Sequence, residues 1–323
     1  MGPRLSWLVA VCVVVVAAGC KGKSAPAGPP LGSGNVTSLS PAANDPSFAS
    51  PFDATPSPDG KTIYFAALVG TDPAILSAPA TGGGTATQLA LGAPLISPFG
   101  IAIDSAGAKL FIADAYGTSD PTDDSGSILV VPVAGGAPSV LAGTVGYSPR
   151  GVTLVSSSSG DTVFFTGTDP VTSKAGVFSI PAAGGTAVTL AEGSPFVDPS
   201  GVAVTAAGMA FVVDTVATSQ GTASVLQVSH GQVSALAQDL RVGYPGGIAL
   251  SQDESAVLVS GLDPILRTDV VLRIAVAGGA TTSLSHGIDT FQESAGLHRA
   301  QNAEVYAWAD SAANNTGTVY VLK

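Results

Sequence analysis

Hydrophobic and polar residues alternate with a period of two in short runs along most of the chain. Runs such as "GIAI" (100–103) and "LFIA" (110–113) are rich in β-branched and aromatic residues, and turns rich in glycine, proline and aspartate separate them. This pattern is typical of short β-strands joined by tight turns. The chain is therefore predicted to be all-β after about residue 35.

One arrangement of strands recurs six times. "SPFGIAIDSAGAKLFIAD" (97–114) returns as "DPSGVAVTAAGMAFVVD" (198–214) and "YPGGIALSQDESAVLVSG" (244–261), among other copies. The lead residues of the six copies are Pro51, Pro98, Pro149, Pro199, Pro245 and Ser294, so one repeat is 46 to 51 residues long. A fixed period of this length indicates a repeat architecture.

Each copy supplies four strands. Two strands lie in the pattern above, a third precedes a Gly-Gly turn, as in "VFSIPAAGG" from residue 177, and a fourth follows that turn. Four-stranded units of this length are typical of the blades of a β-propeller. The sequence therefore predicts a six-bladed β-propeller over residues 35–323.

The last repeat is incomplete at its end. "GTVYVLK" (317–323) matches a third strand and has no fourth strand after it, whereas "NVTSLS" (35–40) matches the fourth strand "TAVTLA" (186–191). We expect residues 35–40 to pair with residues 318–323. This pairing would close the ring and protect a strand edge that is otherwise prone to aggregation.

The repeat "P-x-G-I-A-x-D-x-x-G-x-x-L-F-I-A-D" resembles those of the NHL, YVTN and SMP-30/gluconolactonase propellers over residues 36–323. The resemblance implies the architecture and leaves the function open, because such folds carry unrelated activities. SMP-30-like lactonases hold a divalent metal through a Glu before Gly-Pro and through Asn and Asp at blade starts. Here those starts carry Phe99, Arg150, Ser200 and Gly246, and no Glu-Gly-Pro occurs. That metal site is therefore not carried over, and we expect neither a cofactor nor a catalytic residue set of that family.

The N-terminus has the pattern of an export signal. Arg4 precedes an apolar run from Leu8 to Ala18, which suits a signal peptide and is too short for a permanent membrane span. The run ends in Ala-Ala-Gly-Cys20, which resembles the lipobox of bacterial lipoproteins. The resemblance implies that residues 1–19 are removed and that Cys20 carries the acyl chains. An ordinary secretory signal, with Cys20 incidental, is the alternative.

The next residues read as a tether. Residues 20–34 are rich in proline, glycine and serine and predict a flexible linker between a lipid anchor and the propeller. Lys21 stands where an Asp retains well-studied lipoproteins in the inner membrane, so the expected location is the outer membrane of the bacterial cell envelope.

Charge narrows the range of partners. Removing residues 1–19 takes away Arg4 and changes the net charge from −11 to −12. Nucleic acid is excluded as a partner, since binding to phosphates depends on clustered Lys and Arg. The acidic loop 113–127 and the recurring Asp-Pro at Asp72, Asp169 and Asp263 fit turns capped by Asp better than a calcium loop, because the alternating Asp spacing of such a loop is missing.

Candidate ligand-binding residues come from the predicted geometry of the blades. Loops that lead into the first strand and loops after the second strand open on one face, around the channel mouth. That face is expected to carry Asp53, Phe99, Tyr147, Arg150, Phe196, Asp198, Tyr244 and Glu293. His298 and Arg299 fall in the first strand of the last blade, which lines the channel, where other blades carry apolar residues. They either form a channel site with Glu293 or satisfy one another in an irregular last blade.

Three functions remain open at this point. The first is a non-catalytic binding or scaffolding module that holds a protein or small-molecule ligand on the mouth face. The second is a divergent hydrolase or lactonase with a channel site around Arg150, Glu293, His298 and Arg299. The third is a structural envelope protein without a discrete ligand.

Lipidation can be tested directly. Cys20→Ser should abolish the incorporation of an acyl label and move the protein from the membrane fraction to the soluble fraction. The measurement is metabolic labelling with a fatty acid followed by fractionation. A Cys20→Ser protein that still partitions with membranes although it takes up no acyl label would contradict the lipoprotein assignment.

Overall fold

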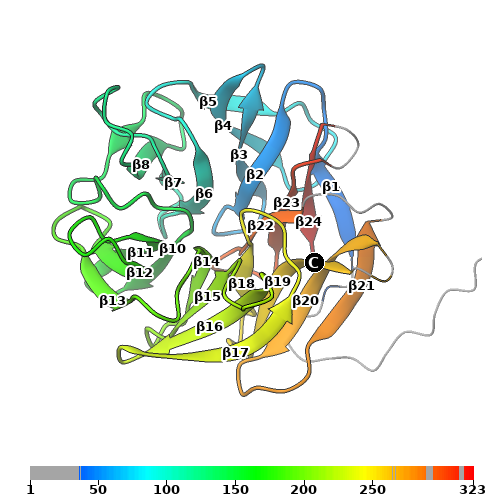
Figure 1. The fold of residues 1–323 in the computed structure, drawn as a ribbon. Coiled ribbons are helices and arrows are strands. Elements are labelled where there is room, and N and C mark those ends of the chain that lie inside the picture. Colours follow the sequence, from blue (N-terminus) through cyan, green and yellow to red (C-terminus); the bar gives the residue numbers. More distant parts are fainter. Residues whose placement is uncertain (1–35, 37, 264, 266, 289–293, 313–315) are drawn as a thin grey trace, which may run out of the picture. The chain divides into compact units, whose positions relative to one another are not determined.

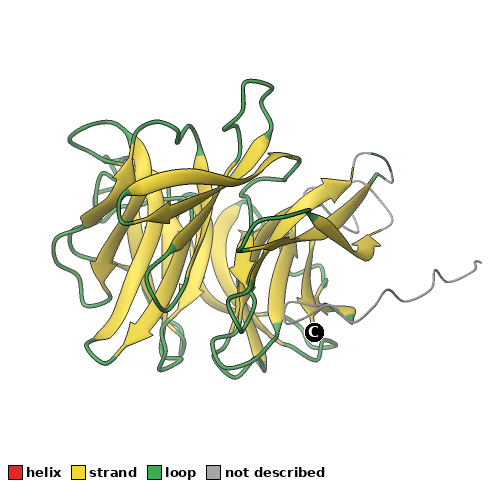
Figure 2. Cartoon of the chain, turned by 90° about the horizontal axis from the view of Figure 1, so that it is seen from below, coloured by secondary structure: helices red, strands yellow, loops and turns green. Residues whose placement is uncertain are grey.

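A computed structural model describes residue 36, residues 38–263, residue 265 and residues 267–288, 294–312 and 316–323. These residues form 24 β-strands in six four-stranded sheets (Figure 1). Strands and loops account for the whole described part of the chain (Figure 2). Within it, no helix is long and apolar enough to cross a membrane.

The six sheets are the blades. Blade 1 consists of β2 (Ala49–Pro56), β3 (Thr62–Val69), β4 (Asp72–Pro79) and β5 (Thr87–Leu91). Blade 2 consists of β6 (Pro98–Ile103), β7 (Lys109–Asp114), β8 (Ser127–Pro132) and β9 (Ser139–Val140). Blade 3 consists of β10 (Val152–Ser157), β11 (Gly160–Thr168), β12 (Ala175–Pro181) and β13 (Val188–Glu192). Blade 4 consists of β14 (Pro199–Val204), β15 (Ala210–Asp214), β16 (Ala223–Ser229) and β17 (Gln232–Leu240). Blade 5 consists of β18 (Ile248–Leu250), β19 (Ala256–Asp263), β20 (Thr268–Ala275) and β21 (Thr282–Ile288). Blade 6 consists of β22 (Ser294–Arg299), β23 (Tyr306–Asp310), β24 (Thr318–Leu322) and β1 (Leu39–Ala43).

The blades surround a central channel. The first strands of successive blades, β2, β6, β10, β14, β18 and β22, contact one another in turn, and β22 returns to β2. Within each blade the four strands pair antiparallel in chain order, apart from the last blade, where β1 joins β24. This confirms the predicted six-bladed β-propeller.

The seam of the ring is closed by the N-terminal strand, as predicted. Leu39 pairs with Leu322 and Ala43 pairs with Val319, with an irregularity in register between Pro41 and Ala43. The strand spans 39–43, whereas the prediction placed it at 35–40. The shift follows from burial: Ala42 and Ala43, and not the polar residues before them, are the residues buried in the core against blade 1.

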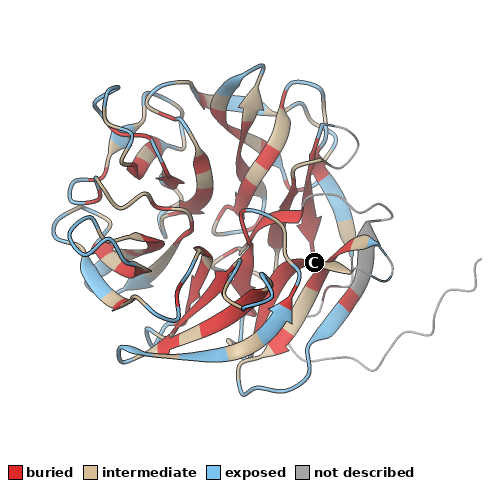
Figure 3. Ribbon diagram, in the orientation of Figure 1, coloured by how far each residue is buried: buried red, intermediate tan, exposed pale blue. Residues whose placement is uncertain are grey.

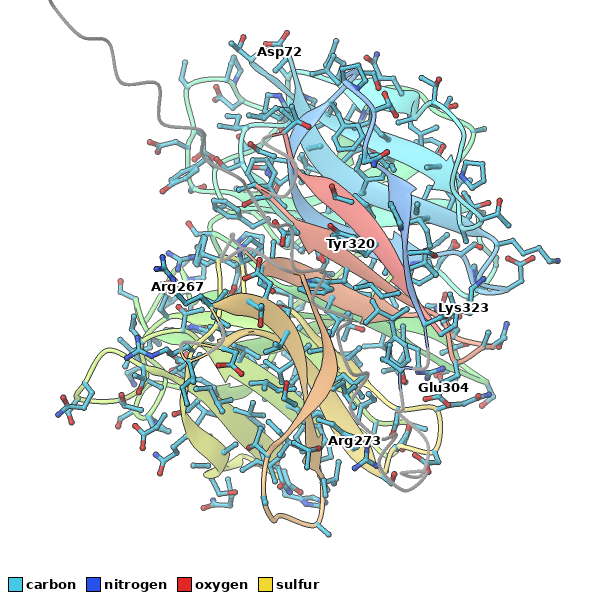
Figure 4. The ribbon with its side chains drawn as sticks, turned by 90° about the vertical axis from the view of Figure 1, so that its right-hand side faces the viewer. Asp72, Arg267, Arg273, Glu304, Tyr320 and Lys323 are labelled. Atoms are coloured by element: carbon cyan, nitrogen blue, oxygen red, sulfur yellow. The ribbon has the colours of Figure 1, made fainter. Side chains whose placement is uncertain are left out.

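The two faces of the ring differ in their connections. One face is formed by the loops into each first strand and by the loops between second and third strands, and we call it the mouth face. Its described residues are 44–48, 70–71, 92–97, 115–126, 141–151, 169–174, 193–198, 215–222, 241–247, 265, 267, 311–312 and 316–317. The chain enters β1 on the other face, where the Ser38 amide donates to the Lys323 carbonyl over 2.9 Å. Arg267 of the mouth face and Lys323 lie on opposite sides in Figure 4.

The hydrophobic core lies between neighbouring blades (Figure 3). Each core cluster joins side chains of two adjacent sheets, as where Phe111 of blade 2 packs with Phe165 and Phe178 of blade 3. The alternating apolar residues of the middle strands face these layers, which explains why the second and third strands are buried almost throughout. Burial of this apolar surface is the main force that holds the sheets together.

A ring of glycines lies around the channel at the level where neighbouring blades come into close contact, and we call this level the waist. Gly100, Gly151, Gly201, Gly247 and Gly296 occupy the third position of five blades, and a Cβ on any of them would lie within 3.0 Å of an atom of the next blade around the ring, in its first strand or just before it. On Gly100 it would meet the Arg150 carbonyl oxygen at 2.6 Å. The "P-x-G" start of the repeat is therefore a packing requirement between blades.

The glycine requirement can be tested with Gly201→Ala. We expect the free energy of unfolding to fall by about 1–3 kcal/mol, since overpacking forces the backbone apart. Gly84→Ala is the matched control, because its Cβ would lie 3.4 Å from the Pro79 Cδ in ordinary contact, and it should stay within about 0.5 kcal/mol. Chemical denaturation measures both. Equal stabilities of the two variants would show that the waist can relax.

Candidate functional site

Three aromatic rings cover the mouth of the channel. Phe52 of blade 1 packs edge-to-face on Phe99 of blade 2 with ring centroids 6.1 Å apart, and Phe99 packs on Tyr244 at 5.3 Å. Tyr244 belongs to the loop into blade 5, so this row of rings joins blades that are distant around the ring. Phe52 and Phe99 are half-buried and Tyr244 is 39% exposed. Aromatic rings in such contacts keep a fixed orientation while one side remains accessible to solvent.

An ion pair completes the mouth. The Arg150 guanidinium pairs with the Asp198 carboxylate and lies 5.9 Å from the centroid of the Tyr244 ring. Asp198 is itself held by the Thr215 hydroxyl, which donates to its Oδ2 over 2.6 Å. A guanidinium near a ring face gains an attraction that is larger where water is partly excluded. Arg150 thus links blade 3 to blades 4 and 5.

Asp53 and His298 meet just below the mouth. The His298 Nε2 lies 2.8 Å from Asp53 Oδ2, which also accepts a hydrogen bond from the Ile101 amide over 2.9 Å. The other oxygen, Oδ1, accepts from the Ala54 amide over 2.8 Å. The Asp53 side chain is 4% exposed and that of His298 is 12% exposed. One buried carboxylate therefore connects blades 6, 1 and 2.

Asp53 stands where the other five blades have glycine. Its side chain occupies the space that a Cβ on Gly296 would need. Together with the aromatic row it leaves a cavity of about 10 Å³ at the waist, lined by glycine backbone, Phe99, Arg150 and His298. That volume is about what one water molecule requires. The waist therefore has no room for an organic substrate.

A larger space lies on the other side of His298. It has a volume of about 90 Å³ and is lined by Glu254, Arg299 and Gln301 together with residues of the first strands. Arg299 donates through Nε to the Leu250 carbonyl over 2.9 Å and through Nη1 to the Ala300 carbonyl over 2.6 Å. Gln301 donates across the channel to the Ile103 carbonyl over 3.1 Å. These side chains join blades and leave a space for a few water molecules or a small polar ligand.

The structure brings Asp53 together with His298. It also brings Arg150 together with Tyr244 and Asp198, and it packs Phe99 on Tyr244. Tyr147 lies apart from them. Its ring packs on Phe165 and Phe178 at 5.4 and 4.9 Å within blade 3, and burial raises the pKa of its hydroxyl. Glu293 and Cys20 lie outside the described residues. The described residues contain no group of three or more His, Cys, Asp or Glu side chains that could hold a metal ion.

Several residues of the site were missed by the sequence analysis. Phe52 follows a lead proline as Phe99 does, and this shared position was a usable signal. Thr166 and Ser260 stand where other blades carry Ala or Val, and their hydroxyls donate over 2.6 Å to the Ser200 and Ala295 carbonyls of the next blade. A polar residue at an apolar register position was the signal for these two.

Several aspartates at the mouth face cap backbone amides, whereas Asp72, which was expected to form such a turn, begins β4 and pairs with Val69. Asp169 Oδ1 accepts from the Val171 amide over 2.7 Å and Asp263 Oδ1 from the Ile265 amide over 2.8 Å, which are the expected turns capped by Asp. Asp120 and Asp123 accept amides two residues on in the same way. Asp114 accepts four amides, although burial still raises the pKa of its carboxyl. These carboxylates therefore stabilise turns.

Comparison with known proteins establishes the architecture alone. No protein-family model and no curated protein matches the sequence. Among solved structures, a gluconolactonase from Xanthomonas campestris superposes with a TM-score of 0.57 at 16% identity, over 89% of this chain and 97% of that one. A putative TolB from Agrobacterium tumefaciens gives 0.56 at 14% identity, over 85% and 90% of the two chains. TolB from Acinetobacter baumannii gives 0.52 at 11% identity and 85% of this chain, which spans 55% of its length.

The chain is a six-bladed β-propeller. At such identities the likeness shows a shared fold and transfers no activity to this propeller.

Asp53→Ala tests whether the carboxylate holds the propeller together at the waist. The Ile101 amide and His298 would lose a charged acceptor, so the free energy of unfolding should fall by about 1.5–3 kcal/mol. Asp124→Ala is the matched control, because that aspartate is exposed on the loop 115–126 and makes none of these contacts, so its removal should stay within about 0.5 kcal/mol. Denaturant unfolding of both proteins measures the difference. An Asp53→Ala protein as stable as the parent would argue against this role.

Proposed function

We propose that the propeller is a non-catalytic binding or scaffolding module, anchored by lipid on Cys20 at the bacterial cell envelope, and that it binds its partner on the mouth face. The observation that carries the proposal is that the channel is filled at its waist and that its polar side chains bind to neighbouring blades. Its polar side chains hydrogen-bond across blades, and its waist offers about 10 Å³. Binding is therefore assigned to the outer surface around Phe99, Arg150 and Tyr244.

The point where the chain enters the propeller supports binding on the mouth face. The described chain enters β1 at Ser38, hydrogen-bonded to Lys323 on the face opposite the mouth. Seventeen residues lie between Cys20 and Ser38, and as a flexible chain they span about 20–25 Å on average. An anchor at Cys20 thus leaves the mouth face free to meet a partner in the surrounding space.

A divergent hydrolase is the second candidate, and one contact favours it. The pair Asp53–His298, 2.8 Å apart, is an arrangement that can orient a histidine as a general base, and it borders the space of about 90 Å³. The likeness to a gluconolactonase fold adds to the case. This reading requires turnover of a lactone or ester that His298→Ala abolishes.

Site-specific photo-crosslinking in the source bacterium separates the two candidates. A photoreactive phenylalanine analogue at position 99 or 244 should give a discrete adduct, and the same analogue at the exposed Ser158 of the opposite face should give none. In parallel, purified protein with its metal content measured is tested on a panel of lactones and esters. Adducts confined to position 158, or turnover that is lost in His298→Ala, would overturn the binding proposal.

A further inference from the structure

Exposed apolar side chains are distributed unequally between the two faces. Of the ten large apolar side chains exposed in the described residues, eight lie on mouth-face loops. Six of these eight belong to the loops that serve blades 3 to 5: Val145, Val171, Val197, Val216, Tyr244 and Ile265. Single exposed apolar residues are common on any protein. Their concentration on one half of one face calls for a specific explanation.

The two most exposed members, Val171 and Ile265, occupy equivalent positions. They are 90% and 89% exposed, at the tips of the β11–β12 and β19–β20 hairpins. Each follows an Asp-Pro and donates its amide to that Asp, over 2.7 and 2.8 Å. Ser173 and Arg267 then close the two turns with the same φ of 57°. The fold thus builds the same tip twice and places a β-branched side chain at its end; we call Val171 and Ile265 the prongs.

The corresponding tip is absent from the described part of blade 1. There the β3–β4 hairpin closes through a two-residue turn, Gly70 and Thr71, and Asp72 pairs with Val69. Blade 4 lies between the two prong-bearing blades and contributes Val197 and Val216, which are 59% and 42% exposed. Each of blades 3 to 5 therefore exposes apolar side chains on the mouth face, with the prongs on the two outer blades.

Basic residues accompany the prongs. The four described Lys and Arg residues of the mouth-face loops are Arg150, Lys174, Arg241 and Arg267, and all of them serve blades 3 to 5. Lys174 stands three residues after Val171, and its ammonium lies 3.6 Å from the Glu192 carboxylate at a largely exposed position. Arg267 stands two residues after Ile265 and is exposed. A complementary surface would place carboxylates beside its apolar contacts.

A bilayer held by the proposed lipid anchor does not fit this surface. The described chain enters β1 at Ser38 on the opposite face, and Arg267 and Lys323 lie on opposite sides of the propeller (Figure 4). The face that carries the prongs is therefore opposite to the one where the described chain enters the propeller.

We infer that the propeller docks a protein partner through the two prongs, Val171 and Ile265. The partner presents two apolar sockets, with a carboxylate for Arg267 beside the socket that receives Ile265. This inference rests on the proposed function and narrows it, because it names half of the mouth face and the chemistry of the partner. Two rigid contacts on one partner act together, so the loss of either one weakens the whole complex.

The test uses the full-length chain in the source bacterium, with a photoreactive residue at position 171 or 265. The same protein should be crosslinked from both positions. Ile265→Ser should reduce the adduct from position 171 at least tenfold, which is about 1.4 kcal/mol, and Val171→Ser should do the same at position 265. Val188→Ser is the matched control, since Val188 is 60% exposed and begins β13 at the other face. It should leave both adducts unchanged.

The other outcomes overturn the inference. Adducts with phospholipid would identify a membrane surface, and an adduct of twice the chain's mass would identify a second copy. An adduct at one prong that is insensitive to the other would remove the two-point contact. Adducts from position 244 with none from 171 or 265 would leave the proposed function standing without the prongs. Adducts from none of these positions would remove both. Melting of the purified variants establishes that they remain folded.

Discussion

The closeness of neighbouring first strands at the channel is the constraint on which this structure depends. At the third position of a blade the next blade's backbone comes so near that Gly151, Gly201 and Gly247 have no room for a Cβ. This contact fixes how far each sheet can move toward the axis, and the apolar layers between the sheets then fill the wedge outside it. The ring closes only when all six contacts between neighbouring first strands have compatible spacing. The glycine of the repeat therefore fixes the spacing of the blades, and this spacing determines where the loops of the mouth face lie.

Asp53 shows what happens where that constraint is relaxed. A side chain in place of glycine needs space, and it takes the space above Gly296 and reaches Ile101 and His298. Burying a carboxylate is unfavourable unless its oxygens are hydrogen-bonded, and here both oxygens accept bonds. The same atoms that could serve a channel site are thereby committed to joining three blades. The proposed function therefore places binding on the outer surface, because at this level the axis is filled.

The fold was predictable because each blade repeats the same local pattern, whereas the site depends on contacts that no repeat contains. The strand alternation and the lead residues were enough for six blades and for the closing strand at the seam. The contact of Phe99 with Tyr244 joins residues 145 positions apart in different blades, and periodicity carries no information about it. Tyr147 fills a similar place before a lead proline as Tyr244 does, yet it packs inward on Phe178. The direction in which a loop side chain points depends on the residues around it in space, and the spacing of the repeat does not specify these.

One position in each blade decides how far the mouth face projects. At the end of the second strand, blades 2, 4 and 6 carry Asp114, Asp214 and Asp310, and strand pairing stops there opposite Ser127, Ser224 and Thr318. The carboxylates of Asp114 and Asp214 accept amides from the incoming loop, which holds these loops close to the sheet. Blades 1, 3 and 5 carry Ala67, Gly167 and Gly261 at this position, and their hairpins continue as paired strands. Blades with aspartate at this position therefore stop pairing there, and blades with a small residue pair further, and in blades 3 and 5 these longer hairpins end in Val171 and Ile265.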